Sequence, residues 1–208
     1  MDQRFSDYLT QYKANYIFTE TEREQTEVCG VRITVTLYEY ETEAEHRDRA
    51  DILMEKDGLR YRCEGIERTH WDFFPVIVDG RSYILFSKTL YGFTLIDPDT
   101  LTEAYDYFPE KVYGGEEAFI ITDAKTFGRY LIFEGCYWGS PYGFVAYDHE
   151  SGKFVDLSDH CGVNDGVSRM EGDTLILSGL DLDMERMGVS LTEGDLDSLM
   201  LQYGTNDL

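Results

Sequence analysis

The pattern of hydrophobic and polar positions divides the chain into a helical start, a long β-rich middle and a helical end. Near the N-terminus, apolar and aromatic side chains recur at helical spacing: Phe5, Tyr8, Leu9, Tyr12 and Tyr16. Because residues three and four apart share one face of a helix, this spacing predicts a helix over 4–16 that docks on the body of the protein. A polar stretch, 19–27, follows it.

From Val31 the period of the pattern changes to two. Four apolar residues alternate with polar ones: Val31, Ile33, Val35 and Leu37. This alternation predicts a strand with one buried and one solvated face. After a charged connection over 39–49, Asp57-Gly58 provides the residues of a tight hairpin turn, since glycine tolerates positive φ. Residues 59–64 alternate again and form the predicted return strand.

The middle of the chain contains short, nearly continuous apolar runs at 73–78, 83–86, 119–121 and 131–133. A strand with a solvated face would alternate, so these runs predict strands with both faces covered. Turn residues at the ends of the runs favour strands over buried helices.

The C-terminal part has a looser pattern. Residues 159–166 are typical of a loop, and 174–177 predict one more strand. Thr192, with Asp195 three residues later, predicts the N-cap of a final helix. The apolar stripe of that helix consists of Leu196, Leu199, Met200 and Tyr203.

Two segments of the middle region repeat each other. Ile84-Leu85-Phe86 recurs 47 positions later as Leu131-Ile132-Phe133, and Tyr91-Gly92-Phe93 recurs 51 positions later as Tyr142-Gly143-Phe144. An apolar strand precedes each copy, and a turn and a strand follow it. The repeated unit is therefore four strands joined by hairpins, with copies at about 72–110 and 116–158.

A four-stranded antiparallel unit at this spacing resembles a blade of a β-propeller, in which units of about 40–50 residues pack face to face. The resemblance is architectural, covers 72–158 only and points to no specific family. The expected fold is all-β dominated, with tandem four-stranded antiparallel meanders that form a propeller-like or partial propeller arrangement, and with short N- and C-terminal helices. A β-sandwich of two related meanders is the alternative.

The expected domain organisation has two sections within one compact unit. Residues 1–70 form an N-terminal helix and an antiparallel hairpin section. Residues 71–208 form the repeat region, with a strand and a helix at its C-terminal end.

Composition and charge restrict the classes of partner. The chain carries 41 acidic and 18 basic residues, for a net charge of −23. Nucleic-acid binding requires Lys and Arg to replace phosphate counterions. An anionic membrane surface repels a chain with a large negative charge. Neither nucleic acid nor a membrane surface is therefore expected as a partner. The acidity provides solubility or a surface complementary to a basic protein. No apolar stretch approaches the ~18–20 residues of a membrane span, and no apolar leader begins the chain.

Cysteines and acidic runs indicate neither a metal nor a cofactor. The four cysteines, Cys29, Cys63, Cys136 and Cys161, contain no CxxC pair, so free thiols in a reducing cytoplasm are expected. The run around Asp181 lacks the glycine and the terminal bidentate glutamate of a calcium loop.

An insertion suggests a binding loop. The second copy has four more residues than the first between its second and third strands, and the longer loop contains Tyr137 and Trp138. Insertions in repeats map to loops on one face, and these residue types are enriched at recognition hot spots. The alternative is that Trp138 fills a gap against an adjacent unit. The candidate binding residues are Tyr137, Trp138, Tyr142, Tyr91 and Trp71.

Catalytic candidates are weaker, because they do not form a motif. His70 and Asp72 stand at the junction of the two sections, and His160 is adjacent to Cys161, with His149 as a residue that folding could bring near. Neighbouring residues on a strand point to opposite faces, so adjacency alone does not make a catalytic pair.

These observations favour a non-enzymatic acidic protein-binding module, similar to an inhibitor or an immunity protein with a basic partner. The alternatives are a small-ligand binder or enzyme, whose His, Asp and Cys groups meet only in three dimensions, and a scaffold that pairs exposed blade edges with partners.

Overall fold

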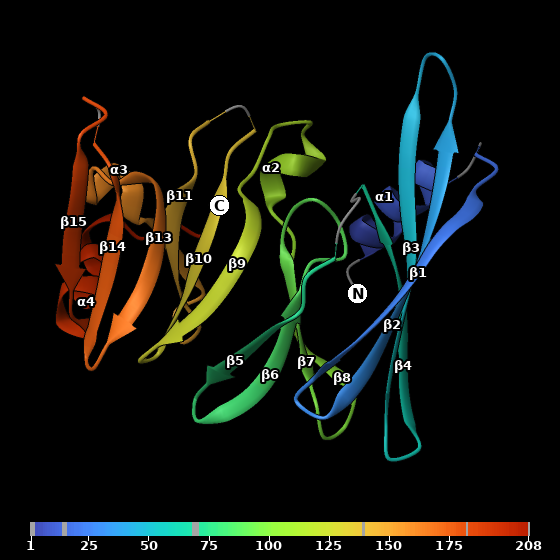
Figure 1. The fold of residues 1–208 in the computed structure, drawn as a ribbon, viewed down its shortest axis with the longest axis horizontal. Helices are drawn as coiled ribbons and strands as arrows, with labels where there is room; N and C mark the ends of the chain where they lie inside the picture. The colour runs from blue at the N-terminus through green and yellow to red at the C-terminus, as the bar shows by residue number, and fades with distance from the viewer. Residues whose placement is uncertain (1–2, 14–15, 68–70, 139, 182, 208) are drawn as a thin grey trace. The chain divides into compact units, whose positions relative to one another are not determined.

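The computed structural model describes residues 3–13, 16–67, 71–138, 140–181 and 183–207. Within them, fifteen strands and four helices follow one another along the chain (Figure 1). By its internal contacts the chain divides into two compact units: 1–75 with 82–108, and 76–81 with 109–208. No described helix is long and apolar enough to cross a membrane.

The first sheet contains strands β1 to β4, each paired antiparallel with the next in the order β1-β2-β3-β4. Their bounds are β1 Thr19–Val28, β2 Val31–Glu41, β3 His46–Lys56 and β4 Leu59–Ile66. The predicted strand from Val31 and the hairpin at Asp57-Gly58 are confirmed. Both turn residues have positive φ, 49° and 83°, as a type I′ turn requires.

Two stretches without a clear pattern are also strands in this sheet. Nine of the ten residues of β1 are exposed, so no apolar period marks it. The expected connection over 39–49 is a hairpin in which β2 runs on to Glu41 and β3 begins at His46. Its side chains are mostly polar because this end of the sheet lies outside the core.

Helix α1 (Gln3–Lys13) docks as predicted but ends earlier than the expected 4–16. Phe5 and Leu9 are buried, and the rings of Phe5 and Tyr8 pack on Phe108 at centroid distances of 5.0 and 5.4 Å. Tyr16 was expected on the helical stripe, but its ring instead packs at a tilt of 55° against that of Tyr40 of β2, with centroids 4.7 Å apart.

The two copies of the repeat are two four-stranded sheets. The first contains β5 (Phe74–Val78), β6 (Arg81–Phe86), β7 (Phe93–Asp97) and β8 (Thr102–Tyr107) in that order. The second contains β9 (Ile120–Phe127), β10 (Tyr130–Cys136), β11 (Gly143–Asp148) and β12 (Lys153–Asp156), also in chain order. The predicted tandem meanders are therefore confirmed. Packing of successive meanders in the manner of propeller blades stays a prediction.

The C-terminal part contains a three-stranded sheet and short helices. Its strands are β13 (Asn164–Glu171), β14 (Thr174–Leu180) and β15 (Arg186–Leu191), and its helices are α3 (Leu157–Cys161) and α4 (Glu193–Tyr203); α2 (Glu110–Tyr113) precedes β9. The expected loop at 159–166 is wrong, because Asp156 caps α3 and β13 begins at Asn164. A single helical turn has no period to detect.

The predicted N-cap of the final helix is confirmed. The Thr192 side chain accepts a hydrogen bond from the Asp195 backbone N–H, and the Asp195 carboxylate accepts one from the Thr192 backbone N–H. Leu196 and Met200 are buried as expected, whereas Tyr203 is 42 % exposed.

Each unit has its own apolar core. In the first, alternate residues of β2 and β3 pack with Trp71 and with side chains of β6 and β7. In the second, one face of the β9–β12 sheet packs with β14, α3 and α4. Of the predicted apolar runs, 84–86, 119–121 and 131–133 are buried throughout, which confirms strands covered on both faces there. The same prediction is wrong for 73–78, because Pro75 and Ile77 of β5 are exposed while Val76 and Val78 are buried, so this strand has one open face.

Candidate functional site

The second unit carries a hollow of about 690 Å³ at the end of its four-stranded sheet where β11 begins. Segments distant in sequence line it: the first turn of α2, the residue before β9, the loop after β10, helix α3 and the end of the chain after α4. The volume lies in the range of small-ligand pockets, about 300–1,000 Å³.

Aromatic rings form two walls of the hollow. Tyr137 follows β10 and packs edge-on against Phe119, with ring centroids 5.3 Å apart. The Nζ of Lys111 lies 5.2 Å from the centre of the Tyr137 ring, so this wall already holds a cation. On the other wall, His160 of α3 stacks on Tyr203 of α4, with centroids 3.9 Å apart and planes within 20°.

Three carboxylates line the same hollow, and the backbone positions two of them. Asp156 accepts a hydrogen bond from the Asp159 N–H (3.1 Å) and thereby caps α3. The carboxylate of Asp207 accepts the backbone N–H groups of Glu110 (3.0 Å) and Lys111 (3.2 Å). Asp159 is exposed at the rim.

Hydrogen bonds also fix the floor of the hollow. The backbone N–H of Phe144 donates to the hydroxyl of Ser158 at 2.8 Å and ties α3 to the start of β11. A Cβ at Gly143 would lie 2.7 Å from that hydroxyl, so the close approach needs glycine. This hydrogen bond and the close approach at Gly143 hold α3 against the start of β11.

The electrostatic environment is acidic. Burial raises the pKa of Asp156 above its ordinary value. Burial, with the neighbouring carboxylates Asp156, Asp159 and Asp207, raises the pKa of Tyr137 to about 12, so its hydroxyl stays protonated at neutral pH. Among the described lining residues, Lys111 is the sole Lys or Arg.

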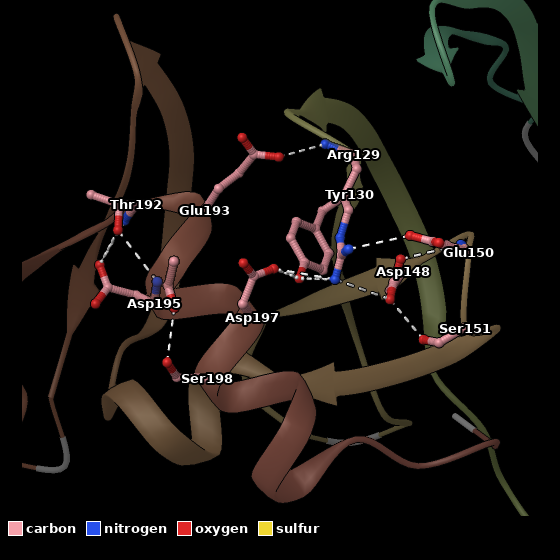
Figure 2. Close-up of polar contacts among 11 residues, drawn as sticks. Arg129, Tyr130, Asp148, Glu150, Ser151, Thr192, Glu193, Asp195, Asp197 and Ser198 are labelled. Atoms are coloured by element: carbon pink, nitrogen blue, oxygen red, sulfur yellow. Dashed lines mark hydrogen bonds and ion pairs between the residues drawn. The ribbon is translucent and has the colours of Figure 1, made fainter.

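Helix α4 is held to the second meander by a polar network around Arg129, drawn in Figure 2. The guanidinium lies 3.2 Å from Asp197 of α4, 3.3 Å from Glu150 and 3.5 Å from Asp148. The backbone N–H of Arg129 donates to Glu193 at 2.9 Å. These contacts fix the helix that carries Tyr203, and so they support the wall of the hollow.

The structure places the candidate binding residues in two groups. Tyr137 lines the hollow, and Trp138 beside it is 65 % exposed and so fills no gap in a core. Tyr142 is 50 % exposed, and its backbone exchanges hydrogen bonds with Asp165 at the start of β13.

Tyr91 and Trp71 belong to the first unit. Tyr91 is half-buried and Trp71 is 8 % exposed, so neither presents an open aromatic face of the kind that Trp138 presents.

Of the catalytic candidates, His160 alone lines the hollow. His70 lies outside the described residues, and Asp72 belongs to the first unit. β11 begins at Gly143, which lines the hollow, and runs away from it for six residues at ~3.3 Å per residue. His149 follows the far end of this strand and therefore lies away from the hollow. Cys161 is adjacent to His160, but burial raises the pKa of its thiol and disfavours the thiolate.

Sequence reasoning missed Lys111, Asp156 and Asp207 of this site. The cap position of Asp156 before a helical turn was the only local signal among them. Tyr203 was expected in an apolar stripe, and its stacking on His160 depends on the fold.

No group of three or more His, Cys, Asp or Glu side chains that could hold a metal ion occurs among the described residues. Asp181 instead closes a turn, since its carboxylate accepts the backbone N–H groups of Asp183 and Glu185, each at 2.9 Å. Comparisons with protein-family models, curated proteins and solved structures find no match to the chain.

Proposed function

We propose that this chain is a non-enzymatic acidic module that binds a basic protein, with an Arg or Lys side chain of the partner entering the hollow of the second unit. The observation that carries the proposal is the combination of aromatic walls and three carboxylates around one hollow, with Trp138 exposed beside it. An inhibitor or an immunity protein has this kind of role.

The chemistry of the walls suits a cation. Aromatic faces attract ammonium and guanidinium groups, and planar guanidinium also stacks on rings and pairs with carboxylates. The position of Lys111 over Tyr137 is an internal example of the same contact. The Tyr203–His160 stack and Trp138 offer further aromatic surface for a partner's side chain.

The net charge of −23 supports fast association with a basic partner, because opposite potentials steer the encounter. Exposed Trp and Tyr side chains then supply contact area at low conformational cost. The expected binding is therefore sensitive to salt in its rate and to Trp138 in its affinity. The four cysteines are free, which supports the further proposal of a cytoplasmic location.

Capture from an extract tests the proposal with two matched pairs of variants. Asp159→Asn removes a charge at the hollow, and Asp173→Asn removes the same charge in the exposed turn after β13. Trp138→Ala removes the exposed ring, and Leu201→Ala removes another exposed apolar side chain, 89 % exposed on α4.

We expect one basic protein to be retained by the wild type and the two controls and to be lost from the two hollow variants. Retention should also weaken as salt is added. The same proteins on all five baits, retention unaffected by salt, or a bound protein that is not basic would contradict the proposal.

A defined probe tests the chemistry of the hollow directly. N-acetyl-arginine amide and its neutral isostere N-acetyl-citrulline amide differ mainly in charge. Trp138 fluorescence, in a Trp71→Phe background, should respond to the arginine compound at several-fold lower concentration than to the citrulline compound. Equal responses to the two compounds would contradict the proposal that the hollow recognises a cation.

Equal responses would favour the second candidate, a small-ligand site in the same hollow. The observation behind it is that the protonated Tyr137 hydroxyl and the His160 imidazole both line one space of pocket size. A change in Trp138 fluorescence on addition of a neutral metabolite-sized compound, with the same affinity in Asp159→Asn as in the wild type, would identify this function instead.

A further inference from the structure

Strand β1 of the first unit has an open edge. It is the outermost strand of its sheet, and in the described part of the chain it pairs only with β2. It is ten residues long, and nine of them are exposed. A strand of this kind presents a row of unpaired backbone N–H and C=O groups that another strand can use.

The turn after β1 shows which backbone groups point outward. Cys29 and Gly30 form a two-residue turn with φ of 52° and 71°, so the flanking residues Val28 and Val31 form a hydrogen-bonded pair. Alternation along the strand then directs the N–H and C=O groups of Arg23, Gln25 and Glu27 away from β2. These residues form the usable edge.

The edge is acidic. Four glutamates lie on β1: Glu20, Glu22, Glu24 and Glu27. Its one basic residue, Arg23, is already paired with Glu20 at 3.1 Å. A second copy of β1 would place glutamates opposite glutamates, which destabilises a strand pair, whereas Lys or Arg on an added strand would be stabilised.

A small hollow of about 220 Å³ adjoins the same strand. Its apolar lining comes from β1, β2 and the segment after β4: Val28, Ile33, Val35, Trp71 and Phe73. Glu24 of β1 also lines it. The indole N–H of Trp71 is buried and has no hydrogen-bond partner among the described residues. The hollow has room for one apolar side chain.

From these two features we infer that β1 accepts an extended basic segment of another protein as an added strand, with one apolar side chain of that segment in the Trp71 hollow. Backbone hydrogen bonds along an edge give affinity in this mode of recognition, and a side-chain pocket gives specificity. The site lies in the first unit and does not depend on the function proposed for the second.

A labelled peptide tests the inference by fluorescence anisotropy. The probe is a capped nine-residue peptide in which Lys and Thr alternate around one central Leu, and its twin carries Glu in place of each Lys. We expect the basic peptide to bind at least tenfold more tightly, and replacement of its Leu by Ser to weaken binding several-fold. N-methylation of the alternate peptide amides that face β1 should abolish binding. N-methylation of the other set, which faces away from β1, should leave binding unchanged.

A pair of variants tests the edge from the side of the protein. Gln25→Pro removes an outward N–H without taking a bond from the β1–β2 ladder, a change that edge strands tolerate. It should weaken binding about five- to tenfold, since a backbone bond is lost and the proline ring obstructs the added strand. Gln25→Ala also removes the side chain, which lines the Trp71 hollow, but keeps the backbone N–H, so it should weaken binding less than Gln25→Pro does.

Any one of four results would overturn the inference. The first is equal binding of the acidic twin, and the second is insensitivity to both sets of N-methyl groups and to Gln25→Pro. The third is loss of peptide binding in Trp138→Ala, which would place the peptide in the second unit. Self-association of the chain that Gln25→Pro abolishes would likewise assign the edge to a second copy and reject a basic partner.

Discussion

Replacement of Lys88 by methionine tests how the first unit holds a buried charge. The side chain of Lys88 is 2 % exposed, and its Nζ lies 2.7 Å from Glu103 and 3.1 Å from Asp106 of β8. The Tyr61 hydroxyl donates to the same Glu103 oxygen at 2.7 Å, and the Thr94 hydroxyl donates to Asp106 at 2.6 Å. The ammonium therefore joins the β6–β7 connection to the last strand of the first repeat.

The expected loss follows from these contacts. Methionine has a similar volume but leaves two carboxylates without their cation. Removing one partner of a buried ion pair costs roughly 3–5 kcal/mol, and a charged hydrogen bond contributes about 1.5–3 kcal/mol. Glu103 and Asp106 are 24 % and 26 % exposed and can be rehydrated, so the expected loss is ~3 kcal/mol.

Urea unfolding measures this loss. Trp71 reports on the first unit when Trp138 is replaced by Phe, and with m of about 2 kcal/mol/M the midpoint should fall by about 1.5 M. Lys56→Met is the control, because Lys56 pairs with Asp99, whose side chain is 84 % exposed. Equal midpoint shifts for the two variants would refute the reasoning.

The ion pair between Lys88 and Glu103 also makes the stability depend on pH. Burial alone would raise the pKa of Glu103, but hydrogen bonds from Lys88 and Tyr61 outweigh it and hold that pKa below its ordinary 4.5. A lowered folded-state pKa stabilises the protein above about pH 4.5, and this stabilisation is lost as pH falls through the lowered value. The difference between wild type and Lys88→Met should therefore narrow below about pH 4.5 and stay constant above it.

Three further predictions concern the second unit. Gly128→Ala should cost about 1–3 kcal/mol in thermal unfolding, because φ is +56° and a Cβ would lie 2.0 Å from Glu193; Gly152→Ala, at φ +69° with open space, should cost less, and a reversed order would contradict this. Leu196→Ala should cost roughly 2–5 kcal/mol because Leu196 is fully buried, whereas Leu201→Ala on the same helix should change almost nothing. Binding of N-acetyl-arginine amide should weaken as pH falls through the raised pKa of Asp156, which neutralises one carboxylate of the hollow, and Asp156→Asn should abolish that part of the pH dependence.

The strands of the repeats could be predicted because a strand covered on both faces has apolar residues at successive positions, and this pattern is visible in the sequence. The run Tyr130–Phe133 is apolar on both sides because β10 is covered on both faces. Thr192 and Asp195 were recognisable because a capping box needs only local geometry. Strand β1 could not be found in this way, since its exposed side chains carry no apolar period.

The candidate site was predictable only in part. The longer loop of the second repeat identified Tyr137, because an insertion is visible when two copies are aligned. Lys111 and Asp207 are 96 positions apart and meet through a hydrogen bond between a side chain and a backbone N–H. No local pattern encodes such a contact, because it depends on how the end of the chain packs against α2.

We propose above that the hollow of the second unit recognises a cation. Backbone NMR of the isotope-labelled protein, titrated with N-acetyl-arginine amide, tests it residue by residue. We expect saturable shifts confined to the amides around the hollow, at Tyr137, Ser158, Asp159 and His160. Small, non-saturating shifts spread over the acidic surface of both units would contradict it.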